Sequence, residues 1–174
     1  MALRVLPRKF YARPTVEVAR DLLGQVLEFR GLQGRIVEVE AYLGEGDLAA
    51  HSARGMTPRT RVIFGPPGHA YVYFIYGMYY CLNVVAEPEG TAGCVLIRSV
   101  EGWGDGPGKL TRAVGITLEE NGADLTRGPL RILAPAEPVR GEVEVTPRVG
   151  ISQSAHLPLR FVLRAGWTEA SRRE

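Results

Sequence analysis

The stretch from Tyr71 to Asn83, YVYFIYGMYYCLN, constrains the fold of this chain more than any other. It holds five of the seven tyrosines, with Gly77 near its middle. An aromatic run interrupted by one glycine predicts two β-strands joined by a tight turn, because glycine readily adopts the positive φ that such turns need. Tyr76, Met78 and Tyr79 would then lie at an exposed hairpin tip, suited to enter a membrane surface, a protein groove or a stack of bases. Two ordinary core strands and a turn would give the same pattern.

The length and composition are those of one globular domain. At 174 residues the chain can bury a sizeable core, and 45% of its residues are hydrophobic. No apolar run approaches the roughly 20 residues that cross a bilayer, and the amino terminus lacks the hydrophobic segment of a signal peptide. We therefore expect a cytoplasmic protein with one domain over residues 1–174, a core at about 13–165 and a frayed tail at 166–174 that includes Arg172 and Arg173.

The charge and the cysteines permit several functions and favour none. A net charge of +2 is compatible with a polyanion partner. Nineteen arginines against two lysines suit phosphate binding, but genomic base composition or thermal adaptation produces the same bias. Cys81 and Cys94 lie in predicted strands and are interpreted as buried thiols rather than as a disulfide. The scattered cysteines and histidines predict no metal site.

Short helices and strands alternate along the chain. Helices are expected at 15–23, 57–64, 109–114 and 117–120, the last begun by a Thr117 and Glu120 capping box. Strands are expected at 25–29, 35–43, 81–86, 94–100, 130–133, 142–145 and 159–163, with a turn at 30–34. The predicted fold class is α+β: a single domain with a twisted, mostly antiparallel sheet, short surrounding helices and a protruding β-hairpin.

The strand expected at 35–43 has the most informative side-chain alternation. Its period of two places Val37, Val39 and Ala41 on one face, and Ile36, Glu38, Glu40 and Tyr42 on the other. Solvated glutamates would give the same pattern. In the strand at 94–100, Arg98 lies among aliphatic residues and needs a partner, because an unpaired buried charge costs several kcal/mol. Glu40 or Glu38 is the expected carboxylate.

Three further features suit either a binding site or plain structure. His51 follows the strand on a loop or a single helical turn, and a lone histidine is more often structural than catalytic. The glycine-rich stretch 102–108 leads into a helix that carries Lys109, where one phosphate could bind, although a connecting loop would look the same. A basic cluster around the helix at 57–64 could contact phosphate or solvent; it consists of Arg54, Arg59 and Arg61.

Five segments together resemble the alkyladenine DNA glycosylases, also called 3-methyladenine or N-methylpurine DNA glycosylases. The segments are GRIVEVEAYLGEGDLAAHS, TPRTR, YVYFIYGMYYCLNVV, GCVLIRS and GPGKLTRAVGI. The resemblance runs in order from about residue 13 to about residue 162. It implies a base-excision repair enzyme that flips alkylated or deaminated purines out of duplex DNA and hydrolyses the N-glycosidic bond, leaving an abasic site. The implied substrates are 3-methyladenine, 7-methylguanine, hypoxanthine and ethenoadenine.

The resemblance also implies a catalytic centre and a base pocket. Glu40 would activate the water that attacks the sugar C1′ atom, and Arg98 would fix this water and Glu40. The flipped base would lie between aromatic faces, with Asn83 on the pocket floor crowding the amino group of guanine. The main-chain amide of His51 would read the purine edge. The base-pocket residues implied are Tyr42, His51, Tyr73 and Asn83.

For the DNA itself, the resemblance implies that Tyr76 fills the gap left by the flipped nucleotide, flanked by Met78 and Tyr79. Lys109 and Arg59 would contact the DNA backbone. Water as the nucleophile, with no lysine in the pocket to form a Schiff base, implies a monofunctional enzyme without lyase activity. No cofactor is expected. The partner would be double-stranded DNA, and a monomer is expected over a weak dimer because a single domain that wraps DNA needs no second subunit.

The resemblance to the mammalian members does not include their long amino-terminal extension, so we expect no partner that binds through it. The segment 151–156 matches them poorly, so a DNA contact there stays open. The pocket lining outside the named residues can also differ from theirs, so the ranking among the four lesions stays open.

Two other hypotheses compete with this one. The same sheet and hairpin could form a nucleic-acid-binding module without catalysis, although such a module has no use for a carboxylate near a phosphodiester chain. A small-molecule hydrolase could instead use Glu38 and Glu40 as acid and base. Glu38 and Glu40 are two residues apart on one strand face, so they lie about 7 Å apart and point the same way. They could therefore not act on a substrate from two sides, as an acid and base pair must.

Overall fold

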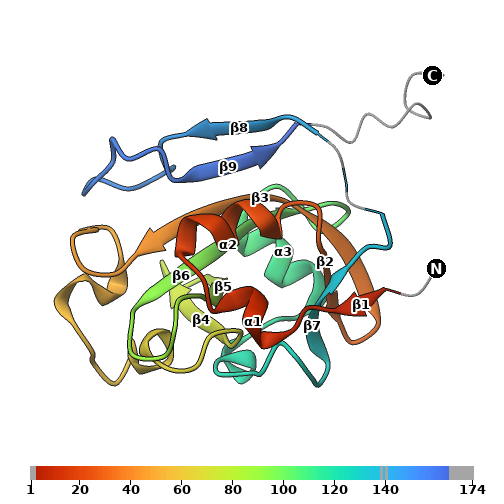
Figure 1. The fold of residues 1–174 in the computed structure, drawn as a ribbon, viewed down its shortest axis with the longest axis horizontal. Coiled ribbons are helices and arrows are strands. Elements are labelled where there is room, and N and C mark those ends of the chain that lie inside the picture. Colours follow the sequence, from red (N-terminus) through yellow and green to blue (C-terminus); the bar gives the residue numbers. More distant parts are fainter. Residues whose placement is uncertain (1–2, 138, 140, 165–174) are drawn as a thin grey trace.

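The computed structural model describes residues 3–137, 139 and 141–164, and it has the predicted α+β architecture (Figure 1). Nine strands form a sheet in the order β1-β7-β2-β3-β6-β5-β4, to which β9 adds through β3 and β8 through β9. All these strand pairs are antiparallel. The strands are β1 (Arg4–Val5), β2 (Val26–Phe29), β3 (Leu32–Leu43), β4 (Ala70–Ile75), β5 (Tyr79–Val85), β6 (Gly93–Val100), β7 (Leu130–Ala134), β8 (Val143–Thr146) and β9 (Arg160–Leu163).

The helices are short and pack around this sheet. They are α1 (Arg8–Tyr11), α2 (Thr15–Leu22) and α3 (Pro107–Val114), with 3₁₀ helices η1 (His51–Arg54), η2 (Arg61–Phe64) and η3 (Leu118–Glu120). Helix α2 contacts β3 and β6, and α3 contacts β5 and β6. No helix of the described part of the chain combines the length and apolarity that a membrane crossing requires.

One face of the central strands builds the core. Val39 of β3 and Ile97 of β6 are paired and fully buried, and Val18 of α2 and Leu110 of α3 belong to the same apolar cluster. Burial of such side chains contributes roughly 1.5–3 kcal/mol each, so this face fixes the position of the strands. The opposite face of β3, β6 and β5 is thereby left free to form a cavity.

The predicted hairpin is confirmed. Strands β4 and β5 pair from Ala70↔Val84 to Ile75↔Tyr79. Tyr76 and Gly77 both have positive φ, +55° and +64°, and the Met78 N–H donates to the Ile75 carbonyl at 3.2 Å. Two positive φ angles are typical of the type I′ turn that suits the twist of a hairpin. The turn thus has the backbone geometry of a hairpin, and it leaves the side chains of Tyr76 and Met78 largely exposed.

Strand β3 corrects the predicted alternation. It begins at Leu32 rather than residue 35, because only Arg30 and Gly31 form the turn from β2. Its pairing with β6 has register shifts around Glu38, which mark an irregular, bulged segment. Ile36 therefore points into the core cluster with Val39, and its placement on the face of the glutamates was wrong.

Other predicted boundaries need small corrections. The helix expected at 57–64 is a turn followed by η2, although the Thr57 hydroxyl does accept the Thr60 N–H at 3.2 Å. Helix α3 starts at Pro107, two residues earlier than expected. The capping box of Thr117 and Glu120 is present. Both cysteines are free and buried, as predicted, whereas the frayed tail expected at 166–174 lies outside the described residues.

Candidate active site

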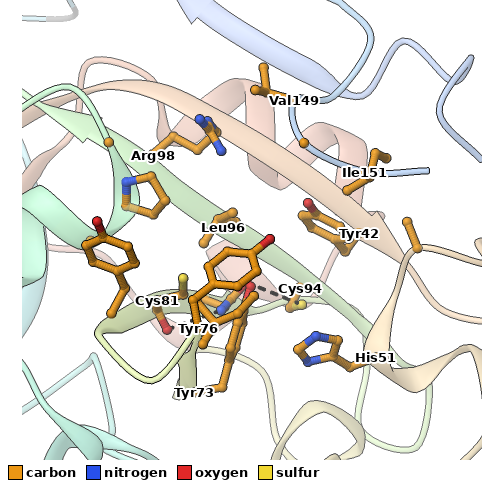
Figure 2. A pocket seen from close by; sticks show the side chains of 18 of the residues that line it. Tyr42, His51, Tyr73, Tyr76, Cys81, Cys94, Leu96, Arg98, Val149 and Ile151 are labelled. Carbon is orange, nitrogen blue, oxygen red and sulfur yellow. Dashed lines mark hydrogen bonds between the residues drawn. The ribbon is translucent and has the colours of Figure 1, made fainter. Parts of the chain in front are cut away.

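A cavity of about 430 Å³ opens on the face of the sheet opposite the core. Register places Glu40 of β3 beside Leu96 of β6, and Leu96 beside Asn83 of β5, so these residues share one face. Loops and helix starts complete the walls: η1, the beginning of α3 and the β8–β9 loop all contribute (Figure 2). The predicted site residues that line this cavity are Tyr42, His51, Tyr73, Tyr76, Tyr79, Asn83, Arg98 and Lys109.

Aromatic rings form much of the wall. The rings of His51 and Tyr73 meet at 4.5 Å between centroids, with an interplanar angle of 62°. The His51 Nδ1 atom lies 2.9 Å from the Tyr71 hydroxyl. Although the His51 ring is exposed toward the cavity, desolvation by the surrounding protein lowers its pKa, and the nearby Arg59 lowers it further. The histidine is therefore neutral at physiological pH, and burial likewise raises the pKa of Tyr73 and keeps that phenol protonated.

Asn83 forms part of the floor in a fixed orientation. Its Nδ2 atom donates to the Tyr71 carbonyl at 3.2 Å and to the Cys81 carbonyl at 3.5 Å, while Oδ1 accepts from the Cys94 thiol at 3.8 Å. Burial raises the pKa of Cys94 to about 12, and it also raises the pKa of Cys81. Both thiols are thus neutral, and neither is a nucleophile at physiological pH.

Glu40 lies just behind the cavity wall and is fully buried. Its Oε1 atom accepts from the Tyr42 hydroxyl at 2.9 Å, and Oε2 accepts from the Val149 N–H at 2.7 Å. The Arg98 Nη1 atom lies 3.8 Å from Oε1. Tyr42 and Val149 both line the cavity, so the carboxylate lies next to it and is oriented by two of its walls.

Glu38 has a different role from Glu40, although the two glutamates are neighbours on β3. Its Oε1 atom accepts from Arg98 Nε and from Arg160 Nε, both at 2.8 Å, and Oε2 accepts from the Ser99 hydroxyl at 3.1 Å. Burial alone would raise the pKa of Glu38, but the hydrogen bonds from Arg160 and Arg98 outweigh it and hold the pKa below its usual value. Glu38 is thus a closer partner of Arg98 than Glu40 is. Because its carboxylate is kept ionised, Glu38 is unsuited to act as a general acid.

The mouth of the cavity carries the hairpin tip and charged residues. Tyr76 and Met78 are 76% and 61% exposed, and Met78 does not line the cavity. Lys109 is ion-paired with Asp105 at 2.8 Å, a partner that the sequence analysis did not consider, and this hydrogen bond raises the pKa of Lys109. The guanidinium of Arg59 lies 5.6 Å from the centre of the Tyr73 ring.

Sequence reasoning missed the β8–β9 loop and a buried ion pair. Val149, Gly150 and Ile151 line the cavity, whereas the sequence points only to the segment 151–156, as a DNA contact that stays open. Arg148 pairs with Asp47 at 2.6 Å, across 101 residues of sequence. No local signal in the sequence indicates either contact. Among the described residues, no histidine, cysteine and carboxylate side chains are grouped as a metal site would require.

Comparison with known proteins places the chain in a family. The methylpurine-DNA glycosylase family matches residues 9–105 and 102–166. A protein of Methanoculleus marisnigri named "Putative 3-methyladenine DNA glycosylase" is 51% identical over 183 residues, covering 91% of this chain and 95% of its own. A protein of the same name from Legionella pneumophila is 47% identical over 175 residues, covering 93% and 96%. This chain belongs to the methylpurine-DNA glycosylase family.

Proposed function

We propose that this protein is a monofunctional DNA glycosylase that removes alkylated or deaminated purines from duplex DNA. The observation that carries the proposal is the position of Glu40, a buried carboxylate oriented by Tyr42 and Val149 at the wall of an aromatic cavity. Family membership supports an activity on alkylated purines such as 3-methyladenine. Substrates of the same kind would be 7-methylguanine, hypoxanthine and ethenoadenine.

The cavity suits a flipped purine. Its volume of about 430 Å³ lies within the range of roughly 300–1,000 Å³ that proteins use for small ligands. Tyr42 would stack on one side of the base, and the His51 and Tyr73 rings, which contact each other at 4.5 Å between centroids, would lie on the other. Electron-rich rings favour an alkylated, cationic purine over a normal base, and a neutral His51 adds no charge that would repel it.

From its place behind the cavity wall, Glu40 would accept a proton from water as the water oxygen attacks C1′. The N-glycosidic bond breaks, the base leaves with the bonding electron pair, and the hydroxyl remains on the sugar as an abasic site. Arg98 lies 3.8 Å from Glu40 and would hold the carboxylate and the water in line. Asn83, with its amide fixed from behind by two carbonyls, would crowd the exocyclic amino group of guanine.

The enzyme would have no lyase activity. The chain has two lysines, and the one at the cavity, Lys109, is ion-paired with Asp105 at the exposed rim. A protonated amine cannot attack C1′ to form a Schiff base. Lys109 and Arg59 would instead contact phosphates, while Tyr76 enters the minor groove and fills the gap in the duplex. The enzyme would act as a monomer and need no cofactor.

Base release tests this proposal directly. Duplex oligonucleotides that carry hypoxanthine, ethenoadenine or 7-methylguanine are incubated with enzyme in EDTA, and hot alkali then reveals abasic sites. We expect release by the wild-type protein but not by Glu40→Gln, and no strand break before alkali. A strand break without alkali would refute the monofunctional mechanism. Tight binding without release of any lesion would identify a lesion-binding module instead.

A further inference from the structure

The ion pair between Arg148 and Asp47 joins two buried charged side chains. Arg148 Nη1 lies 2.6 Å from Asp47 Oδ2, and Nη2 lies 2.8 Å from Oδ1, so the contact is bidentate. Of the ion pairs between described residues, it alone has both side chains fully buried. Burying two charges has a desolvation cost that their attraction often fails to recover. Stability alone therefore gives a poor account of this pair.

The pair joins two loops that flank the cavity. Asp47 follows β3, and its oxygens accept from the Leu43 N–H at 2.9 Å and the Ala49 N–H at 3.2 Å. Arg148 follows β8, and it also donates to the carbonyls of Ala41 at 3.0 Å and Ser154 at 3.3 Å. The loop before His51 and the β8–β9 loop are thus tied to each other and to the end of β3.

Arg148 also supports two of the residues on which the proposed reaction depends. Its guanidinium carbon lies 4.7 Å from the centre of the Tyr42 ring. Because Arg148 is buried and does not line the cavity, it covers the face of this ring that is turned away from the cavity. The next residue along the chain, Val149, donates its N–H to Glu40 at 2.7 Å. One side chain therefore supports both the stacking ring and the donor that orients the carboxylate.

We propose that Arg148, held by Asp47, is a positioning residue that sets the placement of the Tyr42 ring relative to the Glu40 carboxylate. The inference rests on the proposed function. Lysine cannot replace the arginine, because only a planar guanidinium forms the bidentate contact and stacks flat on a ring. Through this residue, stacking of the base and alignment of the water are coupled.

The coupling predicts an effect that depends on the lesion. Methylation at N7 makes 7-methylguanine cationic and weakens its glycosidic bond, so its release depends less on an aligned carboxylate. Ethenoadenine is a neutral base and a poorer leaving group, so its release depends more on Glu40. Loss of a positioning residue should therefore slow the release of ethenoadenine much more than that of 7-methylguanine.

Two variants test this inference. Arg148→Lys keeps the charge, and the double variant Arg148→Met with Asp47→Leu replaces the pair by apolar side chains, which avoids an unpaired buried charge. The matched control is Arg164→Met with Glu144→Gln, which removes an exposed ion pair of the same β8–β9 region. Single-turnover release is measured at saturating enzyme, together with the melting temperature and the fluorescence of ethenoadenine as it stacks in the cavity.

We expect both Arg148 variants to release ethenoadenine about 10 to 100 times more slowly than wild type, with 7-methylguanine affected only a few-fold. The ethenoadenine fluorescence of the bound complex should also change, because the Tyr42 ring has lost its support. The control should match wild type in every measurement.

Release of ethenoadenine by Arg148→Lys at the wild-type rate would overturn the inference. So would equal slowing of both lesions with unchanged fluorescence, which indicates a purely structural role. No release by the wild-type protein would instead refute the proposed function.

Discussion

The hairpin tip and the β3 wall of the cavity are built in opposite ways. At the tip, Tyr76 is 76% exposed and its position follows from two positive φ angles. At the β3 wall, Glu40 is fully buried, and its oxygens are held by the Tyr42 hydroxyl and by the Val149 N–H, which comes from 109 residues further along the chain. The tip is therefore specified locally, whereas the carboxylate is specified by contacts between distant segments.

This difference separates two parts of the proposed function. A side chain that is mostly exposed to solvent can be replaced with little loss of stability, and its purpose lies in what it contacts on binding. A buried carboxylate with fixed partners contributes little to association and much to the geometry of a reaction. Changes at the tip should therefore alter DNA affinity, and changes at the β3 wall should alter the rate of base release.

The largest effect is expected from Glu40→Gln. We expect single-turnover release to fall by about 10³-fold, since general-base catalysis contributes roughly 10²–10⁴-fold. Affinity for lesion DNA should be unchanged or improved, because a negative charge near the phosphates is removed. Release assays and binding titrations on ethenoadenine duplexes measure the two quantities, with Glu144→Gln as an exposed control. A collapse of affinity together with rate would mean that Glu40 is structural.

Glu38→Gln should have a smaller effect on the same step. Arg98, which lies near Glu40, would lose its charged partner Glu38 and become free to turn. A displacement of about 1 Å in a catalytic group can cost about 10²-fold in rate. Because the folded-state pKa of Glu38 is lowered, its stabilisation is present above the unfolded value of 4.5 and is lost as pH falls below it. The melting temperature should therefore fall less steeply in acid for Glu38→Gln than for wild type. A wild-type rate would show that Arg98 needs no orientation by Glu38.

Tyr76→Ser should act on affinity rather than on rate. Stacking of an aromatic side chain on a base contributes about 1–3 kcal/mol, so we expect roughly a 10-fold weaker affinity for lesion duplexes. The rate at saturating enzyme and the melting temperature should change little, because the ring is exposed. Leu118→Ser is the control, since Leu118 is 51% exposed and does not line the cavity. Unchanged affinity would show that the hairpin does not act as a wedge.

The difference between local and long-range contacts also explains which parts of the molecule could be predicted from sequence. The hairpin around Gly77, helix α2 and the capping box of Thr117 and Glu120 depend on neighbouring residues, and all three are present. The face of Ile36 could not be predicted, because the irregular pairing around Glu38 arises only when β6 lies against β3. Local rules therefore placed most of the elements. They predicted a helix at 57–64 where a turn and η2 lie, they indicated neither β1 nor α1, and they did not reveal the irregular pairing of β3.

Long-range contacts account for the rest of the candidate site. The pattern of β3 pointed to Glu38 and Glu40 as partners of Arg98, but it could not divide their roles. That division depends on Arg160, which lies on β9, 122 residues after Glu38. The ion pair of Arg148 and Asp47 has no local signal at all. The proposed catalytic and base-pocket roles rest on the resemblance to a family, because the residue types alone are compatible with several hypotheses.

The smallest effect concerns His51 on the cavity wall and the pH. Its pKa is lowered from 6.5 by desolvation and by Arg59, so the neutral form persists in the folded protein at a pH where an unfolded histidine is already protonated. Binding of a cationic 7-methylguanine duplex should therefore stay constant, relative to ethenoadenine, from pH 7.5 down to about 6.5. At lower pH a positive His51 would repel the cationic base, and only then should the two affinities diverge.

Arg59→Gln removes a neighbouring cation, so it should raise the pKa of His51 and move this divergence to higher pH. Titration of the three histidines by NMR, with His51→Gln to assign the signal, measures the pKa directly. Divergence that starts above pH 7, or a divergence unaltered in Arg59→Gln, would mean that another group controls base binding.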